Sequence, residues 1–113
     1  DSIPLRRAEA LGYDNCVVVL TRNRGYRKPD KRSCVPPLFY RRYPALREAI
    51  SMRNVEYNKQ IAYVEEREAQ GAVVVIRPER AIEVKRMERD TSKLLALYEE
   101  GYELASKVVF VSK

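Results

Sequence analysis

The sequence has no histidine, and this absence removes several kinds of catalytic site. A Ser-His-Asp triad, a Cys-His pair and a histidine-bearing zinc site all need an imidazole, so none of them can form within this chain. Cysteine is nearly as scarce: Cys16 lies in an apolar run and Cys34 in a loop, with no CxxC pair and no metal-binding spacing. A disulfide between the two cysteines is possible, but nothing suggests an oxidising compartment, so we expect free thiols. We also expect no metal and no cofactor.

Glycine and long hydrophobic runs are also rare. None of the four glycines frames a serine, so the sequence has no G-x-S-x-G elbow, no glycine-rich oxyanion loop and no Asp-Gly pair. No apolar run approaches the roughly 20 residues that span a bilayer, and no signal peptide is visible. We expect a cytoplasmic protein, with peripheral contact to a membrane as an open alternative.

What the chain does contain is a globular composition with an unevenly placed positive charge. Its 113 residues are 45% hydrophobic and 34% charged, which fits one folded segment over residues 1–113. The net charge is +6, and residues 22–42 hold eight basic residues against Asp30 alone. The rest of the chain is close to neutral, with 14 basic and 15 acidic residues. The excess charge therefore lies in one loop and the turn after it.

The basic loop at residues 22–32 is the candidate binding surface, and three interpretations of it are open. It is a solvated loop, or it contacts anionic lipid headgroups at about 1 kcal/mol per basic residue, or it binds nucleic acid with Tyr26 stacked on a base. A single aromatic residue among the charges makes nucleic acid the weakest of the three. The candidate anionic-surface contacts are Arg22, Arg24, Arg27, Lys28, Lys31 and Arg32.

Hydrophobic periodicity predicts an alternation of helices and strands. Two short apolar runs read as strands that are covered on both faces. Between them, apolar residues from Leu46 to Val64 lie within about 60° on one face of a long helix. The expected elements are a helix at 4–12, a strand at 15–22, a loop at 23–37, a helix at 44–70, a strand at 72–78 and a last helix capped by Asp90 or Thr91.

Two residues and the end of the chain interrupt these patterns. Arg53 falls within the apolar stripe, so its charge must pair with a carboxylate, reach solvent, or face the active-site region of a larger protein together with Tyr57 and Asn58. Gly101 lies inside the last helix, where glycine costs about 1 kcal/mol relative to alanine, which suggests close packing against another backbone. Residues 107–112, "KVVFVS", fit either a longer helix or a strand.

The expected fold class is α/β: a partial three-layer sandwich with two parallel strands joined by a right-handed helical crossover, and with flanking helices. Two parallel strands make a poor independent sheet, because each needs lateral partners and cover on both faces. The pattern therefore predicts part of a larger α/β sheet, which would self-associate when isolated.

Five stretches, in order and at matching spacing, resemble the C-terminal part of bacterial patatin-like phospholipases. Each motif is weak alone, but their order is specific and the resemblance covers nearly the whole chain. The stretches are "DSIPLRRAEALGYDNCVVVLTR", "GYRKP", "LFYRRYPALREAISMRNVEYNKQ", "VVVIRPE" and "RMERDTSKLLALYEEGY".

The resemblance implies a fold whose Ser-Asp dyad hydrolyses lipid acyl esters, with the catalytic part preceding this chain. Asp1 matches the first residue of the family's D-x-I-P turn, just past the catalytic aspartate, so no residue here inherits a catalytic role. The implied function is that of a non-catalytic C-terminal portion, inactive alone, whose partner is the missing N-terminal part. The competing interpretation is a stand-alone binding module that uses residues 22–32 on anionic lipid or nucleic acid.

Overall fold

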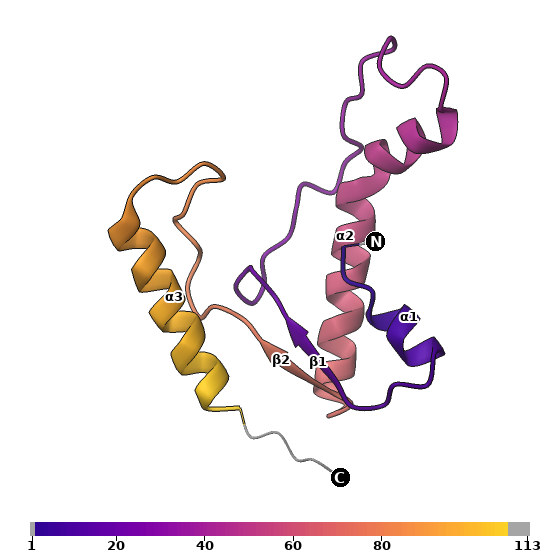
Figure 1. Ribbon diagram of the computed structural model, residues 1–113. Helices are drawn as coiled ribbons and strands as arrows, with labels where there is room; N and C mark the ends of the chain where they lie inside the picture. Colours follow the sequence, from indigo (N-terminus) through magenta and orange to yellow (C-terminus); the bar gives the residue numbers. More distant parts are fainter. Residues whose placement is uncertain (1, 109–113) are drawn as a thin grey trace. The chain divides into compact units, whose positions relative to one another are not determined.

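The computed structural model describes residues 2–108, and this range contains three helices and two strands (Figure 1). The described chain forms two compact units, one of residues 2–16 and 27–73 and the other of residues 17–26 and 74–108. In chain order the elements are α1 (Leu5–Ala10), β1 (Cys16–Val19), α2 (Pro44–Ala69), β2 (Val73–Ile76) and α3 (Thr91–Ser106).

The two strands are parallel neighbours in one sheet, so the predicted mixed α/β class with two parallel strands is confirmed. The backbone N–H of Leu20, just beyond β1, donates to the carbonyl of Ile76 at 2.8 Å. The prediction that the first strand is covered on both faces is wrong. Val18 is buried, whereas Val17 and Val19 are 41% and 69% exposed, so within the described residues one face of β1 is open.

The long helix α2 has the bounds that its sequence predicts. Pro44 occupies the first turn, where its missing N–H costs nothing, and Gly71 follows the last turn with φ +70°. The apolar stripe that was expected to be core is buried at Ile61 and Val64 but 46% exposed at Leu46. Only the carboxyl half of the stripe therefore behaves as core.

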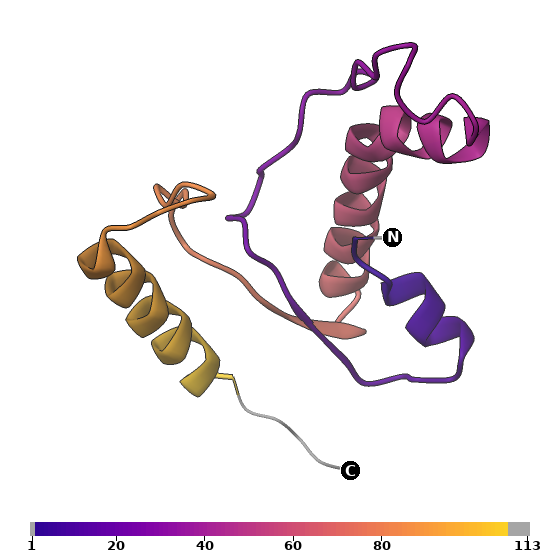
Figure 2. The same cartoon turned by 45° about the horizontal axis from the view of Figure 1, so that its top comes forward.

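The short helix α1 packs beside the carboxyl half of α2, as both ribbon views show (Figures 1 and 2). Leu5 is buried, and the backbone N–H of Ile3 donates to the side-chain oxygen of Gln60 at 3.1 Å. Leu11, which lies past the last helical residue of α1, is 59% exposed.

In the other unit, α3 begins as predicted at Asp90, whose carboxylate accepts hydrogen bonds from the backbone N–H groups of Ser92 and Lys93. No residue of α3 is buried in the described structure. The expected close packing at Gly101 is wrong, because nothing lies within 4 Å of where its Cβ would be. Most of the stretch 107–112 lies outside the described residues.

Candidate functional site

Two cations of the basic loop are paired with carboxylates of α2. The guanidinium of Arg27 donates to both carboxylate oxygens of Glu65, at 2.6 and 3.4 Å, and both side chains are more than half covered. Arg32 lies 3.3 Å from a carboxylate oxygen of Glu48, in a more exposed pair. These two candidate surface residues therefore have their charge compensated within the chain.

Lys28 is held more completely. Its backbone N–H donates to the side-chain oxygen of Asn58, and the Asn58 amide donates back to the Lys28 carbonyl, both at 2.9 Å. Its ammonium nitrogen lies 4.1 Å from the centroid of the Tyr57 ring, a cation–π contact. Tyr57 and Asn58 thus fix the basic loop, a role that the sequence did not suggest for them.

The other three candidate residues, Arg22, Arg24 and Lys31, differ from the three whose contacts with α2 are described above. Arg22 stacks on Tyr26, with its guanidinium carbon 4.9 Å from the ring centroid, and Arg24 and Lys31 are exposed. Arg22 and Arg24 belong to the unit of residues 17–26 and 74–108, whereas the other four candidates belong to the unit that contains α2. The six predicted contacts are thus divided between the units. The nucleic-acid interpretation depended on Tyr26 stacking on a base. In the structure the Tyr26 ring already contacts Arg22 of the same chain.

Arg53 is exposed, so its charge reaches solvent from the middle of α2. This is one of the alternatives expected from its place in the apolar stripe, since a long arginine side chain can extend past neighbouring apolar residues. The charge of Arg53 is therefore not buried, and it needs no carboxylate partner to offset a loss of hydration.

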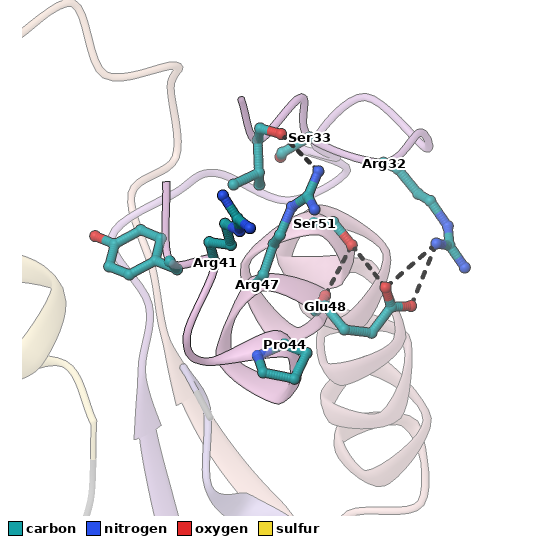
Figure 3. A pocket seen from close by; sticks show the side chains of 9 residues that line it. Arg32, Ser33, Arg41, Pro44, Arg47, Glu48 and Ser51 are labelled. Atoms are coloured by element: carbon teal, nitrogen blue, oxygen red, sulfur yellow. Dashed lines mark hydrogen bonds and ion pairs between the residues drawn. The ribbon is translucent and has the colours of Figure 1, made fainter. Parts of the chain in front are cut away.

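A basic pocket of about 360 Å³ lies where the loop meets the first turns of α2 (Figure 3). Its wall is fixed by hydrogen bonds from the backbone N–H of Ser33 to the Ser51 carbonyl at 2.7 Å and from Arg47 to the Val35 carbonyl at 3.3 Å. The lining residues are Arg32, Ser33, Val35, Tyr40, Arg41, Pro44, Arg47, Glu48 and Ser51.

This pocket was missed by the sequence reasoning. Arg41 and Arg42 contribute to the charge excess of residues 22–42 but are not among the six candidate contacts. In the structure residues 37–42 form turns. The signal that could have marked the pocket is the cluster of aromatic and basic residues immediately before a proline-initiated helix.

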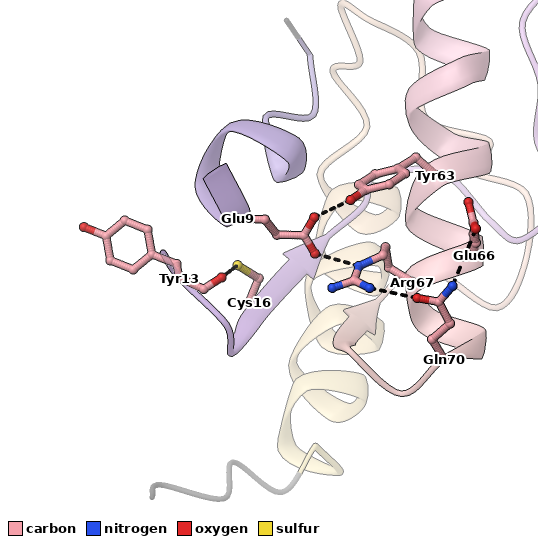
Figure 4. Close-up of polar contacts among 7 residues, drawn as sticks. All are labelled: Glu9, Tyr13, Cys16, Tyr63, Glu66, Arg67 and Gln70. Carbon is pink, nitrogen blue, oxygen red and sulfur yellow. Dashed lines mark hydrogen bonds and ion pairs between the residues drawn. The ribbon is translucent and has the colours of Figure 1, made fainter. Parts of the chain in front are cut away.

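A second polar cluster joins α1 to α2 (Figure 4). The carboxylate of Glu9 accepts a short hydrogen bond from the Tyr63 hydroxyl and another from the Arg67 guanidinium at 2.7 Å. Arg67 also donates to the Gln70 side chain at 2.8 Å, and the Arg6 guanidinium lies 4.3 Å from the Tyr63 ring centroid. These contacts anchor the short helix.

The contacts of Glu9 shift the pKa values of the groups around it. The hydrogen bond from Tyr63, followed by that from Arg67, lowers the pKa of Glu9. The same hydrogen bond raises the pKa of Tyr63, because losing the phenol proton would place two negative charges together. The two pKa shifts favour the ionised carboxylate of Glu9 and the protonated phenol of Tyr63, which are the forms present at neutral pH. This is expected of a cluster with a structural role.

The cysteines are both free, as predicted. The thiol of Cys16 donates to the Tyr13 carbonyl at 3.4 Å (Figure 4), and Cys34 is exposed. Among residues 2–108, no group of three or more histidine, cysteine or acidic side chains is placed to hold a metal ion. Nor is any helix in this range long and apolar enough to cross a bilayer.

Residues 43–109 match the model of a family described as a domain of unknown function, DUF6363. The chain belongs to this family. The DUF6363 match takes in α2, β2 and α3, and it begins at Tyr43, directly after the paired arginines that precede α2. No curated protein and no solved structure matches the chain.

Proposed function

We propose that this chain is the non-catalytic C-terminal portion of a patatin-like acyl hydrolase, and that it completes the sheet on which the catalytic half is built. In this assignment β1, α2 and β2 form a right-handed crossover unit within a three-layer fold. The Ser-Asp dyad would be supplied by the preceding part of the same protein. The resemblance of five ordered stretches to this family supports the proposal.

The observation that carries the proposal is the open face of β1. Parallel strands are normally covered on both faces, because their crossover helices lie on either side of the sheet. Here Val19 is 69% exposed and Val17 is 41% exposed, although both belong to an uninterrupted apolar run. A run of this kind is expected where a further layer of protein packs against the strand, and the rest of a hydrolase fold would provide that layer.

The exposed face of α3 supports the same conclusion. Four of its large side chains are exposed: Leu94 42%, Leu95 57%, Tyr98 67% and Tyr102 64%. The ring centroids of Tyr98 and Tyr102 lie 6.4 Å apart, so the two aromatic side chains are neighbours on this helix. An amphipathic helix with no buried residue gains little stabilisation from packing within its own unit. A protein partner would cover this face.

The competing function, a stand-alone module that binds through residues 22–32, has less support. Arg27 and Arg32 are paired with carboxylates, and Lys28 is fixed to α2. A loop that is fastened to its own helix in this way acts mainly as a structural connection.

The test is an esterase assay with a chromogenic short-chain ester. The full-length gene product should hydrolyse the ester, and the 113-residue chain should not. Adding the purified chain to a separately produced N-terminal part should restore activity that neither piece has alone. Hydrolysis by the chain itself, or an inactive full-length product, would contradict the proposal.

A further inference from the structure

The segment of residues 38–43 combines exposed apolar side chains with arginines. Leu38 is 82% exposed, Phe39 62% and Tyr43 64%, and Arg41 and Arg42 are exposed between them. Large apolar groups in water are unfavourable, and a tight cluster of them beside cations is typical of protein surfaces that enter the headgroup region of a membrane.

The charge around this segment has one sign. Residues 31–47 contain five basic residues and no acidic one. The basic pocket beside the segment is lined by three arginines against one carboxylate, Glu48, which is already paired with Arg32. Charge complementarity therefore favours an anionic partner at this edge of the molecule.

Two guanidinium groups in the pocket are suited to a phosphate. Arg47 is oriented by its hydrogen bond to the Val35 carbonyl, a neutral acceptor that fixes the side chain but leaves its positive charge uncompensated. Arg41 lines the same pocket (Figure 3). Planar guanidinium groups bind phosphate oxygens in pairs of hydrogen bonds, which gives them an advantage over lysine at such sites.

Tyr40 connects the apolar segment to the pocket. It lines the pocket and has a positive φ of +55°, which is unfavourable for a residue other than glycine. Tyr40 lies with its neighbours Phe39 and Arg41 in the turns formed by residues 37–42. The aromatic face of α3, in contrast, is flanked by Glu99, Glu100 and Glu103, and suits a protein partner better than an anionic surface.

We propose that residues 38–43 dock the protein onto an anionic phospholipid surface, with Leu38 and Phe39 in the headgroup region and a lipid phosphate held between Arg41 and Arg47. This inference does not rest on the proposed hydrolase function, because it concerns binding alone. The proposal places the anionic-surface contact at residues 38–43 instead of residues 22–32.

The test is cosedimentation of the full-length gene product with vesicles of phosphatidylcholine, with and without phosphatidylglycerol. Binding should require phosphatidylglycerol and should weaken as salt is added, because the attraction is between charges. The variant Arg41→Gln/Arg47→Gln should bind these vesicles roughly 20- to 30-fold more weakly, since each basic residue near an anionic surface contributes a few-fold.

A matched control has the same loss of charge elsewhere. Arg80 and Arg86 are exposed residues of the connection between β2 and α3, and Arg80→Gln/Arg86→Gln should bind nearly as well as the unchanged protein. For the apolar part, Leu38→Ser/Phe39→Ser should weaken binding, whereas Met87→Ser, at a residue that is 83% exposed, should not. Equal losses in the test and control variants would overturn the proposal.

Three further outcomes would also overturn it: binding that does not depend on phosphatidylglycerol, binding of inorganic phosphate without vesicle binding, and binding of a single-stranded oligonucleotide in place of vesicles. Salt dependence of the unchanged protein provides a readout even where a variant does not fold. Vesicle binding by a protein without esterase activity would contradict the hydrolase proposal and leave this one standing.

Discussion

The side-chain amide of Asn58 is hydrogen-bonded to both main-chain groups of Lys28. Its oxygen accepts from the Lys28 N–H and its nitrogen donates to the Lys28 carbonyl, each at 2.9 Å. The two residues are 30 positions apart, so this contact fixes the basic loop against the middle of α2. It supplies hydrogen bonds that an irregular loop cannot make within itself.

Replacing Asn58 by aspartate should loosen the loop. The change Asn58→Asp keeps the acceptor but turns the donor into a second negatively charged oxygen facing a carbonyl, which should cost about 1–3 kcal/mol. Limited trypsin digestion should then cut faster after Arg27 and Lys31. The control is Asn54→Asp, which makes the same change one turn earlier on α2. Equal cleavage rates in the two variants would show that the contact does not restrain the loop.

The Glu9 cluster should make stability depend on pH in a defined direction. Because the pKa of Glu9 is lower in the folded protein, its contribution is complete above its ordinary value of 4.5 and is lost as the pH falls through the folded pKa. Because the pKa of Tyr63 is raised, its contribution is complete below its ordinary value of 10.0 and is lost as the pH rises further.

Urea unfolding of Glu9→Gln at several pH values checks this direction. The variant should be less stable than the unchanged protein at pH 7, and the difference should shrink in strong acid. Glu56→Gln is the control, because Glu56 forms an exposed pair with Lys59 at 2.8 Å, and such pairs contribute little. A difference for Glu9→Gln that stays constant into strong acid would contradict the assigned cause.

Two glycines should respond to alanine in opposite directions. Gly71 has φ +70° at the end of α2, a conformation in which a Cβ is unfavourable, so Gly71→Ala should destabilise by about 1–2 kcal/mol. Gly101 is helical and has nothing within 4 Å of its missing Cβ, so Gly101→Ala should stabilise by about 0.5–1 kcal/mol. Denaturant unfolding measures both, and a destabilised Gly101→Ala would mean that the full protein packs a backbone there.

The elements of this fold could be predicted because their signals are local. Pro44 and Gly71 mark the ends of α2, and Asp90 supplies the cap of α3, so each boundary depends on one residue. Exposure could not be predicted in the same way. The run containing Val17 and Val19 has the composition of a strand covered on both faces, and composition does not reveal which layer covers it.

The candidate site was predicted less well, for a related reason. Net charge along the sequence pointed to residues 22–32, but the carboxylates that compensate Arg27 and Arg32 come from α2, far away in the sequence. The pocket around Arg47 depends on a contact with Val35 that no local pattern encodes. Long-range pairing therefore decided which basic residues keep an uncompensated charge.

The most direct test of the central claim is the stability of Val19→Asp in the full-length gene product. If the rest of the protein covers the open face of β1, this change should lower the free energy of unfolding by about 2 kcal/mol or more, because it buries a charge. Val19→Thr, which keeps a β-branched side chain, and Met87→Asp, at a residue that is 83% exposed, are the controls. The claim would be contradicted if Val19→Asp and Met87→Asp lowered the free energy of unfolding by amounts within about 0.5 kcal/mol of each other. Equal losses would show that this face of β1 is in contact with water in the full-length protein.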